Sequence, residues 1–230
     1  KIRSRREAYV GPWLPEPLLP DDTRAFAADA PGARAELASD LSLALLHVLE
    51  RLSPEERAAL ILHDAFDCDY SEIAATLEKT EAACRKLVSR ARERVKEDRP
   101  RYTMSKEAHR DLLMRFAKAS ASSDPREMTA LLAPDAIAYT DGGGRVAAAL
   151  NPIYGADKIS RFILGLGKKF YAATVLETAL IEINGQPALV IRDGEEMLGV
   201  IAIETDGEKI TTIYGLRNPD KLKRLTRTLQ

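Results

Sequence analysis

Basic side chains gather in one short stretch near the middle of the chain. From Arg85 to Arg101 there are eight lysines and arginines against three acidic residues, although the whole chain has a net charge of −1. Such a local positive stripe suits DNA, because neutralising phosphates supplies much of the affinity and donors near the start of a groove-facing helix read base edges. A basic helix face that only solvates the protein remains the alternative. The candidate DNA contacts at this spacing are Arg85, Lys86, Ser89, Arg90 and Arg92.

Two helix-start signals place this stretch behind a tight turn. Ser53-Pro54-Glu55-Glu56 predicts an N-cap, a proline at the first helical position and a capping box. Asp69-Tyr70-Ser71-Glu72 predicts a similar start, and Thr80 is placed to cap the helix that carries the basic residues. A periodic apolar stripe from Leu37 to Leu52 predicts another helix in front of these. Two helices joined by a short turn at this spacing predict a helix-turn-helix.

The rest of the chain changes from helical to β patterning. Apolar periodicity predicts helices at about 105–120, 125–133 and 155–171, and strands at 135–141, 174–184, 187–193, 197–205 and 208–216. The last four runs are separated by the hairpin dipeptides Asn184-Gly185, Asp193-Gly194 and Asp206-Gly207. Helices followed by an antiparallel meander indicate an α+β fold with a curved sheet wrapped around a helix.

Acid–base chemistry in such a fold needs a buried group whose pKa is moved toward neutrality. The three histidines, His47, His63 and His109, all lie outside the predicted sheet. Polar residues that could line a pocket, each with an ordinary hydrogen-bonded role as the alternative, are Tyr139, Asp141, Tyr154, Arg192 and Tyr214. An enzyme, a small-ligand sensor and a protein-binding domain stay open, and the pattern favours protein binding. No catalytic residue, cofactor or metal site is assigned.

Longer motifs give the helical part a family resemblance. Leu49-x-x-Leu52-Ser53-Pro54-Glu55-Glu56-Arg57, Tyr70-Ser71-Glu72-Ile73-Ala74 and Val88-Ser89-Arg90-Ala91-Arg92 resemble region 4 of the sigma factors, and most closely the extracytoplasmic-function (ECF) group. The resemblance implies contact with the upstream (−35) promoter element and with RNA polymerase core. One departure is Glu78-Lys79 in the turn, where the family often has glycine and an aliphatic residue.

Three further motifs resemble the ECF subgroup with a fused C-terminal SnoaL-like domain. This resemblance implies a multidomain protein, an all-α helix-turn-helix domain plus an α+β cone with a cystatin-like curved sheet, in which the cone regulates promoter binding in cis. A SnoaL-type enzyme or ligand sensor fused to a DNA-binding module is the alternative. The residues implied in regulation are Trp13, Leu14, Pro15, Glu16 and Pro17; Asp141, Gly142, Gly143, Gly144 and Arg145; and Asn218, Pro219, Asp220, Lys221 and Leu222.

Composition sets the organisation and the compartment. Prolines predict a linker over residues 1–35, followed by the region 4 domain at 36–99 and the SnoaL-like domain at 105–230. Because the chain opens on Lys1 and shows no region 2, we expect it to be a fragment whose region 2 is supplied in cis. Two cysteines, no membrane-length apolar run and no signal pattern indicate a cytoplasmic protein without membrane contact, and Cys84 is expected in the core.

Overall fold

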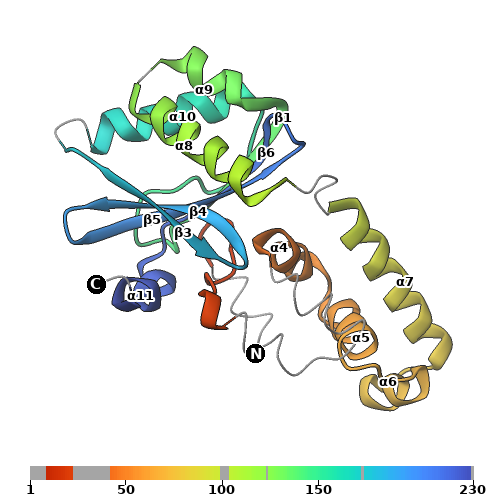
Figure 1. Ribbon diagram of the computed structural model, residues 1–230. Helices are drawn as coiled ribbons and strands as arrows, with labels where there is room; N and C mark the ends of the chain where they lie inside the picture. Colours follow the sequence, from red (N-terminus) through yellow and green to blue (C-terminus); the bar gives the residue numbers. More distant parts are fainter. Residues whose placement is uncertain (1–8, 23–41, 99–103, 123, 172–173, 229–230) are drawn as a thin grey trace. The chain divides into compact units, whose positions relative to one another are not determined.

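The computed structural model describes residues 9–22, 42–98, 104–122, 124–171 and 174–228. The chain divides into two compact units (Figure 1), a helical unit, Leu18–Arg99, and a sheet unit formed by Lys1–Pro17 with Pro100–Gln230. Residues 23–41, which include the start of the helix expected from Leu37, lie outside the described residues.

Within the described residues 42–98, the helical unit contains four helices whose starts are set by local capping. They are α4 (Leu43–Arg51), α5 (Pro54–Asp64), α6 (Tyr70–Leu77) and α7 (Glu81–Asp98). Both predicted capping boxes are confirmed: Ser53 exchanges hydrogen bonds with Glu56, and Asp69 exchanges them with Glu72. Each box satisfies two backbone donors that the first helical turn leaves without partners.

A small apolar core joins α5, α6 and α7. Ala59, Ile73, Cys84 and Val88 are buried together, and the prediction that Cys84 belongs to the core is confirmed. A second cluster, Leu52, Leu60 and Ala91, continues this core along α7. The arrangement fixes α7 as the second helix of a helix-turn-helix, with its other faces away from the core.

The sheet unit is built on a six-stranded mixed sheet in the order β2-β1-β6-β5-β4-β3. The strands are β1 (Leu132–Asp141), β2 (Ile153–Tyr154), β3 (Glu177–Ile183), β4 (Gln186–Asp193), β5 (Glu196–Thr205) and β6 (Ile210–Leu216). The expected antiparallel meander is confirmed for β3 to β6. The parallel pairing of β1 with β6 was not expected.

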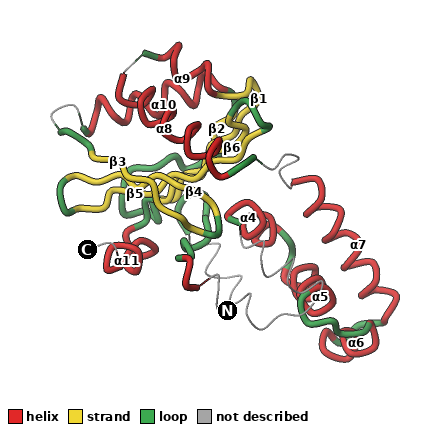
Figure 2. Tube along the Cα trace, in the orientation of Figure 1, coloured by secondary structure: helices red, strands yellow, loops and turns green. Residues whose placement is uncertain are grey.

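Helices cover both faces of this sheet. The helices α8 (Lys106–Ser122), α9 (Pro125–Leu131) and α10 (Ala156–Phe170) lie on one face, and α11 (Pro219–Thr228) lies on the other (Figure 2). The first face holds the main core, in which Phe116, Ile159, Ile203 and Ile210 are almost wholly buried. Strand alternation therefore turns Ala138 toward this core. Tyr139 and Asp141, which are one and three residues further along β1, face the opposite side of the sheet.

Candidate nucleic-acid interface and regulatory cluster

The face of α7 opposite the core is polar and exposed. Cys84, Val88 and Ala91 point into the helical unit, whereas all five predicted DNA contacts, Arg85, Lys86, Ser89, Arg90 and Arg92, are exposed. Residues four apart share a helix face, so Lys86 and Arg90 lie together on the side away from the core, with Ser89 next to Lys86. Among the described residues, neither Lys86 nor Arg90 forms a salt bridge, although the charge of Arg90 acts on Glu56 from a distance.

The turn before α7 has the geometry that a helix-turn-helix requires. Glu78 ends α6 in the left-handed conformation, with φ 54°, and the backbone N–H of Lys79 donates to Ala74. A glycine normally takes this position, so the departure at Glu78 changes the residue and leaves the conformation in place. Thr80 Oγ1 accepts from the N–H of Ala83 at 3.2 Å, which confirms its predicted capping role.

Two of the predicted DNA contacts also have partners inside the helical unit. Arg92 donates from Nη2 and Nε to the Asp64 carboxylate, at 2.6 and 3.2 Å, and this contact raises the pKa of Arg92. The Arg85 guanidinium lies 4.5 Å from the centre of the Tyr70 ring and 2.8 Å from Glu81 Oε2. Sequence reasoning assigned no role to Asp64, because residues 28 apart are not joined by any local pattern.

Glu56 serves both the α5 cap and α7. Its carboxylate accepts from the Ser53 N–H at 3.0 Å and from Arg94 Nη1 at 2.9 Å. Burial raises the pKa of Glu56, but the hydrogen bonds with Ser53 and the charge of Arg94 together lower it by more. The net pKa therefore lies below its ordinary value. The carboxylate therefore stabilises the junction of α5 and α7 in its charged form.

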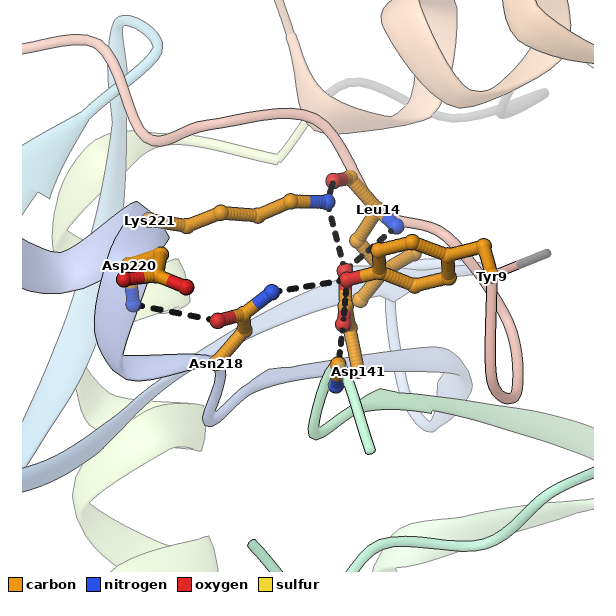
Figure 3. Close-up of polar contacts among 7 residues, drawn as sticks. Tyr9, Leu14, Asp141, Asn218, Asp220 and Lys221 are labelled. Carbon is orange, nitrogen blue, oxygen red and sulfur yellow. Dashed lines mark hydrogen bonds and ion pairs between the residues drawn. The ribbon is translucent and has the colours of Figure 1, made fainter. Parts of the chain in front are cut away.

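The three motifs implied in regulation meet at one buried carboxylate in the sheet unit. Asp141 is fully buried, and its two oxygens accept four hydrogen bonds (Figure 3). Oδ1 accepts from the Tyr9 hydroxyl and from the Gly143 N–H at 3.0 Å. Oδ2 accepts from the Leu14 N–H at 2.9 Å and from Lys221 Nζ at 2.7 Å. We call Tyr9–Pro17 the strap. We call Asp141 and its four hydrogen-bond partners, together with Asn218, the Asp141 cluster.

Lys221 ties the strap to α11. Besides Asp141, its ammonium group donates to the Leu14 carbonyl and lies 3.9 Å from the centre of the Trp13 ring. Burial lowers the pKa of Lys221, and the bond to Asp141 counteracts this. Burial also raises the pKa of the Tyr9 hydroxyl, which accepts from Asn218 Nδ2 at 2.8 Å. The cluster is a buried ion pair in which both charged groups make further hydrogen bonds.

The glycine loop reaches the same place by close approach. Gly143 has φ +59°, and a Cβ there would come within 2.3 Å of Asn218 Nδ2. Gly144 lies beside Val10 of the strap in the same way, at φ +72°. Arg145 Nε lies 3.0 Å from the Asp220 carboxylate. Glycine at positions 143 and 144 therefore lets the loop contact both the segment that begins at Asn218 and the strap.

The remaining motif residues support this contact. Leu14, Pro15, Pro17 and Leu222 are buried, whereas Glu16, Pro219 and Asp220 are exposed. Gly142 lies against the Val146 carbonyl, where a Cβ would come within 2.4 Å. Sequence reasoning missed Tyr9, whose only signal was its position ahead of the proline-rich segment.

The residues proposed for a pocket lie at different places in the sheet unit, although two of them are in contact. Tyr139 and Tyr214 pair across β1 and β6 with ring centres 5.9 Å apart, on the face opposite the main core. Asp141 is used by Lys221 and the strap, and Arg192 lies on β4. Tyr154 borders a cavity of about 420 Å³ whose other walls include Thr129, Lys158 and Lys209, but none of the other proposed pocket residues.

The described residues include no group of three or more His, Cys, Asp or Glu side chains arranged to hold a metal ion. None of the helices they form is long and apolar enough to cross a membrane.

Comparison with known proteins gives consistent matches. Residues 42–95 match the family model described as Sigma-70, region 4. The chain is 35% identical to the ECF RNA polymerase sigma factor SigJ of Mycobacterium tuberculosis, over 96% of this chain and 73% of SigJ. It is 32% identical to the probable ECF RNA polymerase sigma factor SigI of the same organism, over 84% of this chain and 63% of SigI. The crystal structure of M. tuberculosis SigJ matches with a TM-score of 0.66 at 31% identity, over 96% of this chain and 77% of that chain.

Proposed function

Because this chain belongs to the ECF family of RNA polymerase sigma factors, we propose that its helical unit is a region 4 module that binds the −35 promoter element and core polymerase. The observation that carries this proposal is the exposed basic face of α7, presented behind a capped α6 and a left-handed turn at Glu78. A helix held in this way can enter the major groove, where its first turns meet base edges.

Within that face, we assign base reading to Lys86, Ser89 and Arg90. These side chains are exposed and lie away from the apolar core of the helical unit. Arg90 has the planar donor fork that pairs with guanine, and Ser89 accepts or donates to several bases. Arg85 and Arg92 contribute positive charge on the neighbouring flank.

Binding to DNA tests this assignment. Arg90→Ala should weaken binding to a promoter duplex by about 1–3 kcal/mol and relax sequence preference, since a base contact is lost. Lys96→Ala is the matched control, because Lys96 is an exposed basic residue of the same helix in its last turn. An Arg90→Ala variant with unchanged affinity and unchanged salt dependence removes Arg90 from the interface.

We also propose that the sheet unit regulates this module in cis through the strap. The Asp141 cluster holds the strap by hydrogen bonds of Tyr9 and Leu14 with Asp141, of Asn218 with the Tyr9 hydroxyl and of Lys221 with the Leu14 carbonyl. The chain continues from Pro17 directly into the helical unit. Holding the strap therefore fixes the point from which the chain to region 4 starts. An intramolecular contact needs little affinity of its own, because the connecting chain raises its effective concentration.

Run-off transcription by the full-length factor with core polymerase tests the regulatory role. Trp13→Ala, Arg145→Ala and truncation before Asn218 should each change transcript yield without changing the affinity of the region 4 module for DNA. If all three variants transcribe like the parent, the sheet unit has no regulatory role.

The proposal also includes a region 2 supplied in cis and action in the cytoplasm, where the polymerase works. The alternative of an enzyme or ligand sensor is not favoured by the sigma factor relatives.

A further inference from the structure

An aromatic and acidic bracket lies along one flank of α7, built from the end of α5 and the start of α6. Two nitrogens of Arg92, Nε and Nη2, donate to the Asp64 carboxylate. His63 Nδ1 lies 2.9 Å from Asp64 Oδ1 and 3.2 Å from Arg92 Nη2. The His63 ring packs on Tyr70, with ring centres 4.7 Å apart, and the other end of this row is Arg85 over Tyr70. We call Asp64, His63 and Tyr70 the bracket.

The bracket occupies the part of Arg92 that a base-reading arginine needs. An arginine reads guanine with two parallel N–H donors, one to O6 and one to N7. In Arg92 the edge formed by Nε and Nη2 is bound to Asp64, and Nη2 also faces His63. Among the described residues, only Nη1 of this guanidinium has no protein partner. A single outward nitrogen suits a phosphate oxygen, which needs charge and one donor rather than a fork.

Arg85 is held on the same flank in a comparable way. It lies seven residues before Arg92, which is about two helical turns, so both arginines follow one edge of the helix. Its guanidinium plane lies over the Tyr70 ring, and Glu81 Oε2 accepts from Nη2 at 2.8 Å. The two arginines are therefore oriented before DNA arrives, and they border the exposed side chains of Lys86, Ser89 and Arg90 on one side.

We propose that the bracket makes Arg85 and Arg92 phosphate contacts that set the register of α7 on the duplex, and that Asp64 is the positioning residue for Arg92. This inference rests on the proposed function, because it divides the DNA-binding face between positioning and reading. Asp64 has a second effect, since its negative charge limits non-specific attraction by Arg92. Sequence preference is left to Lys86, Ser89 and Arg90.

The experiment measures binding of the whole chain by fluorescence anisotropy over a series of salt concentrations. The probes are a short duplex enriched from a random library by this chain and a scrambled duplex of the same composition. Arg92→Gln should weaken binding to both duplexes by the same factor and make the salt slope shallower by about 0.9, the value of one phosphate. Arg92→Lys should restore most of the slope, because a phosphate accepts a point charge where a bidentate base contact does not.

Asp64→Asn tests whether Asp64 positions Arg92 on the duplex or only stabilises the fold. It should tighten binding to the scrambled duplex and lower the ratio of enriched to scrambled affinity, because Arg92 is no longer held in register. The control is Glu55→Gln, which removes an exposed carboxylate of α5 paired with Lys79 and should leave the ratio unchanged.

Two results would overturn the inference. One is a ratio that collapses about tenfold or more in Arg92→Gln and is not rescued by Arg92→Lys, which would make Arg92 a base reader. The other is unchanged binding to both duplexes, which would remove Arg92 from the interface. Failure of the chain to enrich any sequence would instead overturn the proposed function, and this inference with it.

Discussion

The Asp141 carboxylate joins the strap, the glycine loop and α11 in the sheet unit. Asp141 has no exposed surface and accepts from the hydroxyl of Tyr9, the backbone of Leu14 and Gly143, and the ammonium of Lys221. A buried ion pair adds little when complete, but removing one partner leaves an uncompensated charge in a medium of low dielectric. The same residue therefore has a large effect when its partner is lost.

Replacing Lys221 tests this effect on stability. Lys221→Met should destabilise the sheet unit by about 3 kcal/mol, because the Asp141 carboxylate stays buried without its cation. Trp13, the only tryptophan, lies against Lys221 and reports the transition in urea through its fluorescence. Lys223→Met is the control, since Lys223 is an exposed partner of Asp220, and its midpoint should stay close to that of the parent. Equal midpoints for the two variants would contradict the prediction.

The lowered pKa of Glu56 gives the helical unit a dependence on pH. A carboxyl whose folded pKa is below its unfolded value of 4.5 stabilises the fold above that pH, and this contribution disappears as the pH falls through the folded pKa. Glu56→Gln should therefore cost stability at neutral pH and converge with the parent in acid. Thermal melting followed by circular dichroism from neutral to acid pH checks this. A constant difference between the two proteins at every pH would rule out the charge of Glu56 as the cause.

At the scale of elements, local signals were predictable and long-range pairings were not. The caps of α5, α6 and α7 and the Asn184-Gly185 turn follow from residues within four positions of one another, so the sequence predicted them. The parallel pairing of β1 with β6 joins Ile137 to Thr212, and no local pattern carries that information. The same holds for Arg92 with Asp64, and for Tyr9 in the Asp141 cluster.

The motifs at residues 13–17, 141–145 and 218–222 were identified through family resemblance, and this led to their joint assignment. Their spacing in the chain says nothing of the contact among them, which depends on β1 ending beside β6. The pocket hypothesis did not anticipate the arrangement for the same reason. It grouped polar residues by type, while strand alternation sent Tyr139 and Tyr214 to the face away from the main core.

The left-handed turn after α6 can be improved. Glu78→Gly should stabilise the helical unit by about 1 kcal/mol, because a side chain at φ 54° carries a steric cost that outweighs the extra freedom of glycine in the unfolded chain. Glu78→Ala keeps the Cβ and should give no such gain. Melting temperatures of the two variants decide, and an equal gain in both would point to the lost charge instead.

At the scale of the whole molecule, the two units have separate cores. Ile73 is fully buried in the helical unit, and Ile203 is fully buried in the sheet unit. Because the chain divides into two compact units, each is expected to unfold as a cooperative block.

Two matched core truncations test this independence. Ile73→Ala and Ile203→Ala each remove the same atoms from a fully buried site and should each cost about 2–5 kcal/mol. In scanning calorimetry each variant should lower one transition and leave the other in place. If either variant shifts the whole profile, the chain unfolds as one block.

The strap contact also has a consequence for the order in which the protein is made. Tyr9 and Asn218 are 209 residues apart, and Leu14 and Lys221 are 207 apart. A ribosome completes the helix-turn-helix well before it reaches Lys221, and at roughly 5–20 residues per second the interval lasts many seconds. During that time every element of region 4 has been synthesised, while the lysine that holds the strap has not. Each newly made molecule therefore passes through a stage in which α7 exists before Lys221 completes the Asp141 cluster, and nascent chains differ in this respect from finished ones.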